Sequence, residues 1–136
     1  MSRLDEVRWV DLHTNKDERG VLTAIEGNGG HVPFDIRRIF LVHHAVTDRG
    51  GHAHRDTDQL IVAAAGSLVV EVSDGKIWKS FELGDMIRGL YVPRMVFIQL
   101  RRFSPETVCL VLASTHYDIK RSIRTWEDYL KELEGA

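Results

Sequence analysis

The sequence predicts an all-β fold, either a closed barrel or a sandwich, with one short helix at the C-terminal end. Short segments rich in β-branched and aromatic residues follow one another, with turn residues at intervals of about 8–12 residues. Only the last part of the chain has apolar residues at helical spacing. The 136 residues, 43% of them hydrophobic, are enough for one domain, residues 1–136, around a single core.

Strands are predicted in the first half of the chain on both sides of a glycine-rich loop at residues 27–30. They are Val7–Leu12, Val21–Ile25 and Ile36–His43. A second glycine turn, at residues 49–51, precedes an extended segment that carries His52 and His54.

The second half contains the remaining predicted strands, separated by short turns. The Ser73-Asp74-Gly75 turn closes a hairpin, and the segment Thr107–Ala113 is continuously apolar, as expected for a strand buried on both faces. The predicted strands are Gln59–Ala65, Leu68–Val72, Ile77–Leu83, Leu90–Val92, Val96–Arg101 and Thr107–Ala113.

The C-terminal segment is predicted to be helical. Thr125, with Asp128 three residues later, resembles a capping box at a helix start. Trp126, Tyr129 and Leu133 follow at helical spacing, together with Leu130. We expect this stripe to pack against the β-structure.

Composition and charge exclude several classes of function. The net charge is −2, with 7 histidines counted as neutral, and no basic stripe is present, so nucleic acid is not an expected partner. No apolar run is long enough to span a bilayer, and the charged N-terminus has no apolar signal region. We therefore expect a cytoplasmic protein without a membrane partner. The single cysteine, Cys109, lies in an apolar run and is expected in the core.

The segment Arg49–Arg55 carries the main functional signal. His52 and His54 are two residues apart on an extended segment, so their side chains point the same way. They lie between the glycine turn and the predicted buried strand Gln59–Ala65. Two imidazoles that enter an apolar interior together are metal ligands or acid/base catalysts.

The spacing of this segment resembles the first motif of the cupin superfamily, which implies a jelly-roll β-barrel. The sequence reads His52-x-His54, four residues, Gln59, six residues, Gly66. It departs from the motif at Gln59, where metal-binding cupins have glutamate. Ile98 stands where the second cupin motif has a histidine. Two imidazoles and an amide oxygen make a poor site for a divalent cation, which favours the acid/base role without a metal.

A narrower resemblance covers nearly the whole chain, from about Asp11 to Leu130. The chain is similar to the sugar 3,4-ketoisomerases that act on dTDP-4-keto-6-deoxyglucose, a metal-independent cupin family. The matching blocks occur in order and are Asp17–Leu22, Val32–Phe40, Arg49–His54, Gly66-Ser67, Asp74-Gly75, Gly89–Pro93, Leu110–Ser114, Tyr117-Asp118 and Ile123-Arg124.

This resemblance implies an isomerase of deoxysugar biosynthesis, including that of lipopolysaccharide O-antigen. The keto group of a dTDP-4-keto-6-deoxyhexose would move from C4 to C3 through an enediol. Histidine has a pKa suited to carrying the C3 proton, and the resemblance assigns His52 and His54 as the acid/base pair. It does not say which of them removes the proton. It implies no cofactor, and it implies a homodimer.

The resemblance also implies a set of substrate-binding residues. Arg19 and Arg38 match positions around the ligand, where guanidinium groups suit a diphosphate. Arg49 and Arg88 are further candidates. Gln59 is expected to bond either a sugar hydroxyl or a catalytic histidine.

Three positions depart from the family pattern around the ligand. Glu18 places a carboxylate beside Arg19, Phe40 lacks the hydroxyl of a common tyrosine, and Ile98 replaces a polar residue. These changes point to a related substrate or a different configuration of the product. Two other functions remain open, namely a non-catalytic cupin that binds nucleotide sugars and a metal-dependent cupin enzyme.

Overall fold

The computed structural model describes residues 3–27 and 29–135, and its strands form two larger sheets and a separate hairpin. The first sheet has five strands in the order β1 (Arg8–Asp11), β9 (Arg88–Val92), β6 (Gln59–Ala65), β11 (Val108–Ala113) and β4 (Arg38–His43). The second has five strands in the order β12 (Ser122–Ile123), β5 (Arg49–His54), β10 (Phe97–Arg101), β7 (Leu68–Ser73) and β8 (Trp78–Leu83). Neighbouring strands are antiparallel throughout.

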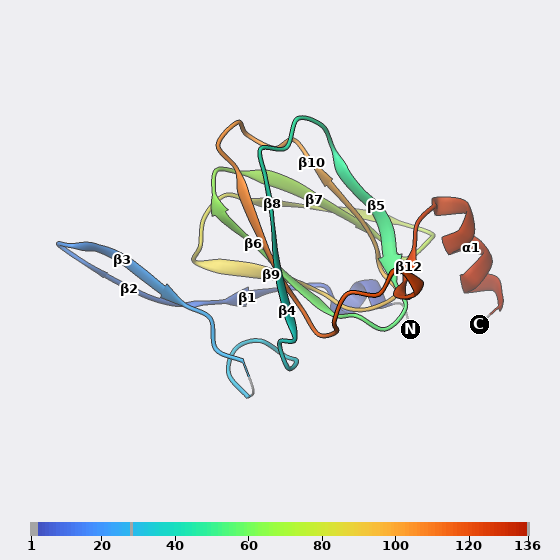
Figure 1. Ribbon diagram of the computed structural model, residues 1–136, viewed down its shortest axis with the longest axis horizontal. Helices are drawn as coiled ribbons and strands as arrows, with labels where there is room; N and C mark the ends of the chain where they lie inside the picture. The colour runs from blue at the N-terminus through green and yellow to red at the C-terminus, as the bar shows by residue number, and fades with distance from the viewer. Residues whose placement is uncertain (1–2, 28, 136) are drawn as a thin grey trace.

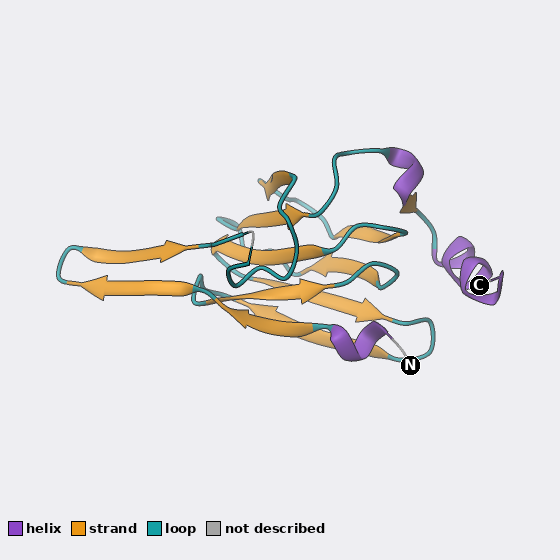
Figure 2. Cartoon of the chain, turned by 90° about the horizontal axis from the view of Figure 1, so that it is seen from below, coloured by secondary structure: helices purple, strands orange, loops and turns teal. Residues whose placement is uncertain are grey.

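The all-β prediction with a C-terminal helix is confirmed, in the form of a jelly roll whose sheets are not closed into one barrel. Figure 2 shows the strands in stacked layers, with the helix α1 (Trp126–Gly135) at one end. Two short 3-10 helices, η1 (Arg3–Glu6) and η2 (Ile119–Arg121), complete the described elements. Within the described residues, the helices are all too short or too polar to cross a membrane.

The central strands β6 and β11 of the first sheet are buried on both faces. Ile61 and Val111 belong to the core cluster between the sheets, whereas Leu60 and Leu112 belong to a second cluster with Val32. Alternate side chains of a strand point to opposite faces, so the two clusters lie on opposite sides of this sheet. The expected burial of the apolar run around β11 on both faces is therefore confirmed. Cys109 is fully buried in the first cluster, as predicted.

The helix α1 packs on the second sheet through the predicted stripe. Thr125 caps the helix by accepting a hydrogen bond from the Asp128 N–H at 3.1 Å. Tyr129 is fully buried, and its hydroxyl donates to the carbonyl oxygens of Met95 at 2.8 Å and Ser73 at 3.2 Å. The Trp126 ring meets the Phe97 ring of β10 edge to face, with 5.1 Å between centroids. These contacts fix the end of the chain against the sheet that carries His52 and His54.

The structure describes all of the predicted Ser73-Asp74-Gly75 turn and part of the predicted loop at residues 27–30. In the Ser73-Asp74-Gly75 turn, Gly75 has a φ of +98°, and a Cβ there would lie 2.7 Å from Leu133 of α1, so glycine is required. In the loop at residues 27–30, the Gly30 N–H bonds the Gly27 carbonyl at 3.2 Å. Asn28, in the middle of that loop, lies outside the described residues.

A hairpin of β2 (His13–Asp17) and β3 (Gly20–Ala24) projects away from both sheets (Figure 1). The strand β2 was not predicted, because its sequence His-Thr-Asn-Lys-Asp has no apolar alternation. Its side chains are mostly exposed, and pairing with β3 rather than burial holds it extended. The hairpin also exposes apolar side chains, with Val21 and Leu22 each 60% accessible to solvent.

Candidate active site

The strand β5 brings His52 and His54 to one side through an irregular pairing with β10. Ile98 pairs with His52 and Gln99 pairs with Gly50, so Gly51 has no partner and forms a bulge. Gly50 and Gly51 both have a positive φ, at +93° and +74°. A Cβ on Gly50 would lie 3.0 Å from the Ile98 carbonyl oxygen. Glycine is therefore needed at positions 50 and 51 to form the bulge that precedes the histidines.

The two imidazoles lie together, as their spacing in the sequence predicts. Their ring centroids are 4.8 Å apart, with the ring planes at 89°. Ala53, between them, is fully buried on the opposite face with the α1 residues Trp126 and Tyr129. The alternation of the strand thus separates a histidine face from a packing face.

The environment of both imidazoles favours their neutral form by lowering their pKa values. Burial lowers the pKa of His52; a bond to the Gly50 backbone opposes this, and the charge of Arg124 lowers it further. Burial also lowers the pKa of His54, to about 4, and the charges of His52 and Arg38 act in the same direction. A neutral imidazole is the form that accepts a proton.

Gln59, at the start of β6, holds one of the two rings. Its side chain is only 4% exposed, and its Nε2 lies 3.3 Å from Nε2 of His54. Because an amide nitrogen only donates, Nε2 of His54 accepts, and neutral His54 carries its proton on Nδ1. Of the two expected roles for Gln59, the structure displays the contact with a histidine.

The histidines line a cleft between the sheets that has two connected chambers. The outer chamber has a volume of about 290 Å³, and the inner chamber about 200 Å³. His52 and Gln59 line both chambers, whereas His54 lines only the outer one. The outer chamber is further lined by Arg38, Phe40, Leu41, Val42, Arg49, Thr57, Thr115, His116, Tyr117, Asp118, Arg121, Ser122 and Arg124. The inner chamber has polar walls from Arg49, His52, Gln59 and Arg124 and apolar walls from Phe40, Val42, Ile61, Ile98, Leu100 and Val111.

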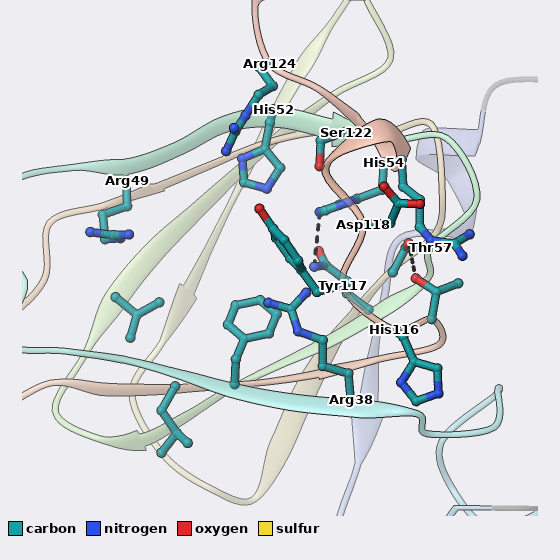
Figure 3. Close-up of a pocket in the computed structure, with 16 residues that line it drawn as sticks. Arg38, Arg49, His52, His54, Thr57, His116, Tyr117, Asp118, Ser122 and Arg124 are labelled. Atoms are coloured by element: carbon teal, nitrogen blue, oxygen red, sulfur yellow. Dashed lines mark hydrogen bonds between the residues drawn. The ribbon is translucent and has the colours of Figure 1, made fainter.

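Arg38 projects into the outer chamber between two aromatic rings. The guanidinium carbon lies 4.5 Å from the Phe40 ring centroid and 5.0 Å from the Tyr117 ring centroid. Stacking between rings fixes the plane of the guanidinium and leaves its N–H groups directed outward. Figure 3 shows the Arg38 side chain and the Tyr117 ring together below His52.

The cleft holds arginines that are not neutralised by carboxylates. Among residues 3–27 and 29–135, no ion pair forms to Arg38, Arg49 or Arg124. Arg121 also lines the cleft, but it pairs with Asp56 at 2.6 Å. Asp118 is the lining carboxylate, and it accepts a hydrogen bond from the Lys120 N–H at 2.9 Å. Unpaired guanidinium groups on three sides favour an anionic ligand such as a diphosphate.

The cleft of one chain does not include Arg19 or Arg88. Arg19 lies at the tip of the β2–β3 hairpin, where its guanidinium bonds Asp17 at 2.7 Å and lowers the pKa of that carboxyl. Arg88, on β9, lies over the Trp9 ring at 3.7 Å from its centroid. The structure thus gathers Arg38, Arg49 and Gln59 with the histidines and leaves these two arginines elsewhere. Their contact with a substrate remains a prediction.

Sequence reasoning assigned no role to several residues that line the cleft. Tyr117 and Arg124 are the most prominent, because one stacks on Arg38 and the other lies close enough to His52 to lower its pKa. Both residues fall in sequence blocks that match the ketoisomerase family, and this match is the signal by which the sequence could have pointed to them. Thr57 and Thr115 share a hydrogen bond of 2.6 Å at the edge of the same chamber, and no sequence pattern marks this pair.

The donor groups around the histidines do not form a metal-binding set. Within the described part of the chain, no three histidine, cysteine or carboxylate side chains are grouped so that they hold a metal ion. The third position beside the two imidazoles belongs to the amide of Gln59, whose nitrogen faces His54. Ile98, opposite His52 on β10, contributes only aliphatic carbon.

Comparison with known proteins identifies the family. Residues 5–134 match the FdtA family, described as WxcM-like, C-terminal. The chain belongs to this family. A curated relative from Aneurinibacillus thermoaerophilus, TDP-4-oxo-6-deoxy-alpha-D-glucose-3,4-oxoisomerase, is 37% identical over 119 residues, which are 86% of this chain and 85% of the relative.

Solved structures of 3,4-ketoisomerases share nearly the whole fold of this chain. A 3,4-ketoisomerase from Helicobacter canadensis has a TM-score of 0.91 at 29% identity and covers 95% of this chain and 98% of its own. The sugar 3,4-ketoisomerase QdtA from Thermoanaerobacterium thermosaccharolyticum, in complex with TDP, has a TM-score of 0.90 at 31% identity, with 95% of each chain covered. This member of the FdtA family is accordingly an isomerase.

Proposed function

We propose that this FdtA-family chain converts a TDP-4-keto-6-deoxyhexose into its 3-keto isomer by histidine-mediated proton transfer without a bound metal. One observation carries the proposal. Two half-buried imidazoles and three arginines that have no carboxylate partner among the described residues line one cleft. The relatives support the substrate class, since their names specify a TDP sugar or the 3,4-ketoisomerase activity.

The chemistry of the shift matches the groups that the cleft provides. The C3–H bond must break, its proton must be held, and a proton must return at C4. A neutral imidazole accepts the C3 proton, and His52 is suited to this step because it lines both chambers. Hydrogen-bond donors such as Arg124 beside His52 would stabilise the negative oxygen of the enediolate.

The two chambers suggest how the substrate lies. Ile98 and Leu100 are among the apolar side chains that line the inner chamber, which suits a 6-deoxy sugar whose C6 is a methyl group. Arg49 and Arg124 line both chambers, and in this arrangement they would bind the diphosphate at the junction. The thymidine would then occupy the outer chamber near Tyr117. In this arrangement His52 faces the sugar.

The test follows the C3 hydrogen of TDP-4-keto-6-deoxyglucose in D₂O by NMR. We expect deuterium exchange at C3 and formation of a 3-keto sugar, both lost in His52→Asn. Chelation with EDTA should leave the rate unchanged, and metal analysis should find no stoichiometric metal. A purified protein that binds TDP tightly but neither exchanges C3 nor turns over would contradict the proposal. A rate that disappears on chelation and returns with added metal would overturn its metal-independent part.

We further propose that the protein is a homodimer. The projecting hairpin exposes Val21 and Leu22, and the edge strand β4 exposes Ile39 at 56% and Leu41 at 53%. A second copy of the chain would cover both apolar surfaces and an unpaired sheet edge. Trp9 on β1 packs against Phe81 of its own chain and is not part of these surfaces. The cytoplasmic location and the role in O-antigen biosynthesis stay predictions.

A further inference from the structure

One wall of the cleft is a short segment, residues 119–124, that leads from β11 back to the second sheet. This return segment consists of η2, of three residues, β12, of two residues, and Arg124. Arg124 lines both chambers, and Figure 3 shows its side chain beside the His52 ring. Elements this short do not hold a side chain in place by themselves. The position of Arg124 therefore depends on the contacts that fix the return segment.

The side chain of Arg55, the residue after β5, ties the return segment to the helix α1. Its Nη1 donates to the carbonyl oxygens of Lys120 at 2.7 Å and Ser122 at 3.3 Å. Its Nε donates to Oε1 of Glu132 on α1 at 2.7 Å, and its Nη2 donates to the same oxygen. The Arg55 backbone N–H also donates to the Arg121 carbonyl oxygen, at 2.7 Å. We call these bonds the Arg55 clamp, and they hold three successive residues of the return segment.

The geometry of the Arg55 clamp is more specific than that of an ordinary surface ion pair. The Arg55 and Glu132 side chains are 42% and 37% exposed, and an exposed ion pair usually contributes little to stability. The guanidinium is planar, however, so two bonds to Glu132 fix the plane in which Nη1 meets the two carbonyl oxygens. Glu132 is itself anchored, because α1 carries the fully buried Tyr129. We therefore expect the clamp to determine where the return segment lies rather than whether the protein folds.

We propose that Arg55 is a positioning residue of the isomerisation, which keeps the Arg124 guanidinium beside His52 by clamping the return segment onto β5 and α1. This inference rests on the proposed function, in which Arg124 stabilises the enediolate oxygen. It extends that function to a residue that lines neither chamber. Arg55 touches no substrate in this arrangement and acts only through the segment that it holds.

Substitution of Arg55 and Arg124, singly and together, tests whether one residue acts through the other. NMR in D₂O measures the rate of deuterium entry at C3 of TDP-4-keto-6-deoxyglucose at saturating substrate. We expect a decrease of about 10- to 100-fold in Arg55→Ala, the scale of a small misplacement of a catalytic group. Arg124→Ala should be at least as slow. The double variant should match Arg124→Ala within about twofold, because the clamp then has no guanidinium left to position.

Arg101→Ala is the matched control. Arg101 lies on β10, is 43% exposed, and bonds Glu71 at 2.9 Å and Oε1 of Gln99 at 2.8 Å, but it lines neither chamber. Its loss should leave the exchange rate within about twofold of the wild type. Glu132→Ala provides a second, milder test if Arg55→Ala does not fold. It removes the anchor and keeps Arg55, so we expect a smaller decrease in the same direction.

The titration of His52 reports the position of Arg124 without any substrate. The charge of Arg124 lowers the pKa of His52, so this pKa should rise in Arg55→Ala, as it should in Arg124→Ala, and stay unchanged in Arg101→Ala. NMR of the histidine ring protons measures it. The other charged or titratable side chains that line the cleft are not substituted, and they are Arg38 on β4, Arg49 and His54 on β5, and His116, Asp118 and Arg121 after β11.

The outcomes distinguish this inference from the function on which it rests. No exchange in the wild-type protein would mean that the proposed function is wrong, and the His52 titration would still decide whether the clamp positions Arg124. Full activity of Arg55→Ala or Arg124→Ala, or an unchanged His52 pKa in Arg55→Ala, would overturn the inference. A double variant much slower than Arg124→Ala would overturn it, because Arg55 would then act independently. Equal decreases in Arg55→Ala and Arg101→Ala would indicate a general loss of stability and would overturn it as well.

Discussion

The side-chain amide nitrogen of Gln59 lies 3.3 Å from Nε2 of His54, at the position where a metal-binding cupin would place a carboxylate. The amide donates a hydrogen bond to the lone pair of Nε2, so this nitrogen is not free to bind a proton. The contact therefore acts in the same direction as burial, which lowers the pKa of His54 to about 4. Burial thus lowers the pKa of His54, and the contact with Gln59 favours the tautomer that carries its proton on Nδ1.

Gln59→Glu should raise the pKa of His54. A carboxylate accepts a hydrogen bond from protonated Nε2 and adds a negative charge beside the ring, and both effects favour the charged imidazole. We expect an increase of about 1–2 pH units, the usual effect of an adjacent opposite charge. Titration of the histidine ring protons by NMR measures it, with His13 as an exposed reference in the same spectra. An unchanged His54 titration would contradict the assigned contact.

Protein stability should fall as the pH is lowered from about 6.5 to 4. The ordinary histidine pKa is 6.5, and that of folded His54 is about 4. Between these values the unfolded chain binds a proton that the folded chain does not, so the free energy of unfolding decreases with decreasing pH. A shift of this size corresponds to a loss of about 2–3 kcal/mol.

Urea unfolding at pH 7.5 and at pH 4.5 tests this pH dependence. In His54→Asn the difference between the two pH values should be smaller, although the lowered pKa of His52 still contributes in the same direction. The control is His13→Asn, which removes an exposed histidine on β2. Equal pH dependence in His54→Asn and the wild type would show that His54 titrates normally in the folded protein.

The fold and the centre of the site could be predicted, because their signals are local. The alternation in His52-Ala53-His54 and the apolar run of β6 determine which side chains face the interior. The positions of Tyr117 and Arg124 could not be derived this way. They reach the cleft only because η2 and β12 return the chain to β5, where Ser122 pairs with His54. No periodicity in the sequence encodes that return.

Arginine substitutions in the cleft should weaken TDP binding. Arg38→Ala removes a guanidinium that is stacked between Phe40 and Tyr117 and has no carboxylate partner among the described residues. A charge-assisted hydrogen bond contributes about 1.5–3 kcal/mol, so we expect the Kd to rise by about 10- to 100-fold. Isothermal titration calorimetry with TDP measures it. The neighbouring Arg37 is exposed, and Arg37→Ala should leave the Kd unchanged.

Tyr129→Phe should destabilise the protein and leave the chemistry intact. The hydroxyl donates to the buried carbonyls of Ser73 and Met95, and both would lose a partner. We expect a loss of about 1–3 kcal/mol in the free energy of unfolding, measured by urea titration. Tyr91→Phe is the control with little effect. A large fall in the rate of C3 exchange in fully folded Tyr129→Phe would show that α1 positions the histidines more directly than its packing suggests.

Arg19 provides a test of whether two chains share one site. It lies on the tip of a hairpin that projects from its own sheets (Figure 1), and its own cleft does not include it. Suppose that the hairpin of each chain reaches the cleft of its partner. A hybrid dimer of one Arg19→Ala chain and one His52→Asn chain then has one intact cleft, with His52 from the first chain and Arg19 from the second. We expect each variant alone to be nearly inactive. Mixing equal amounts, with exchange of subunits, should restore about a quarter of the wild-type rate, because half of the dimers are hybrid and each has one working site.

Mixed samples with no more activity than the separate variants would place Arg19 outside the partner's cleft. Full activity of Arg19→Ala would remove Arg19 from the substrate-binding residues altogether.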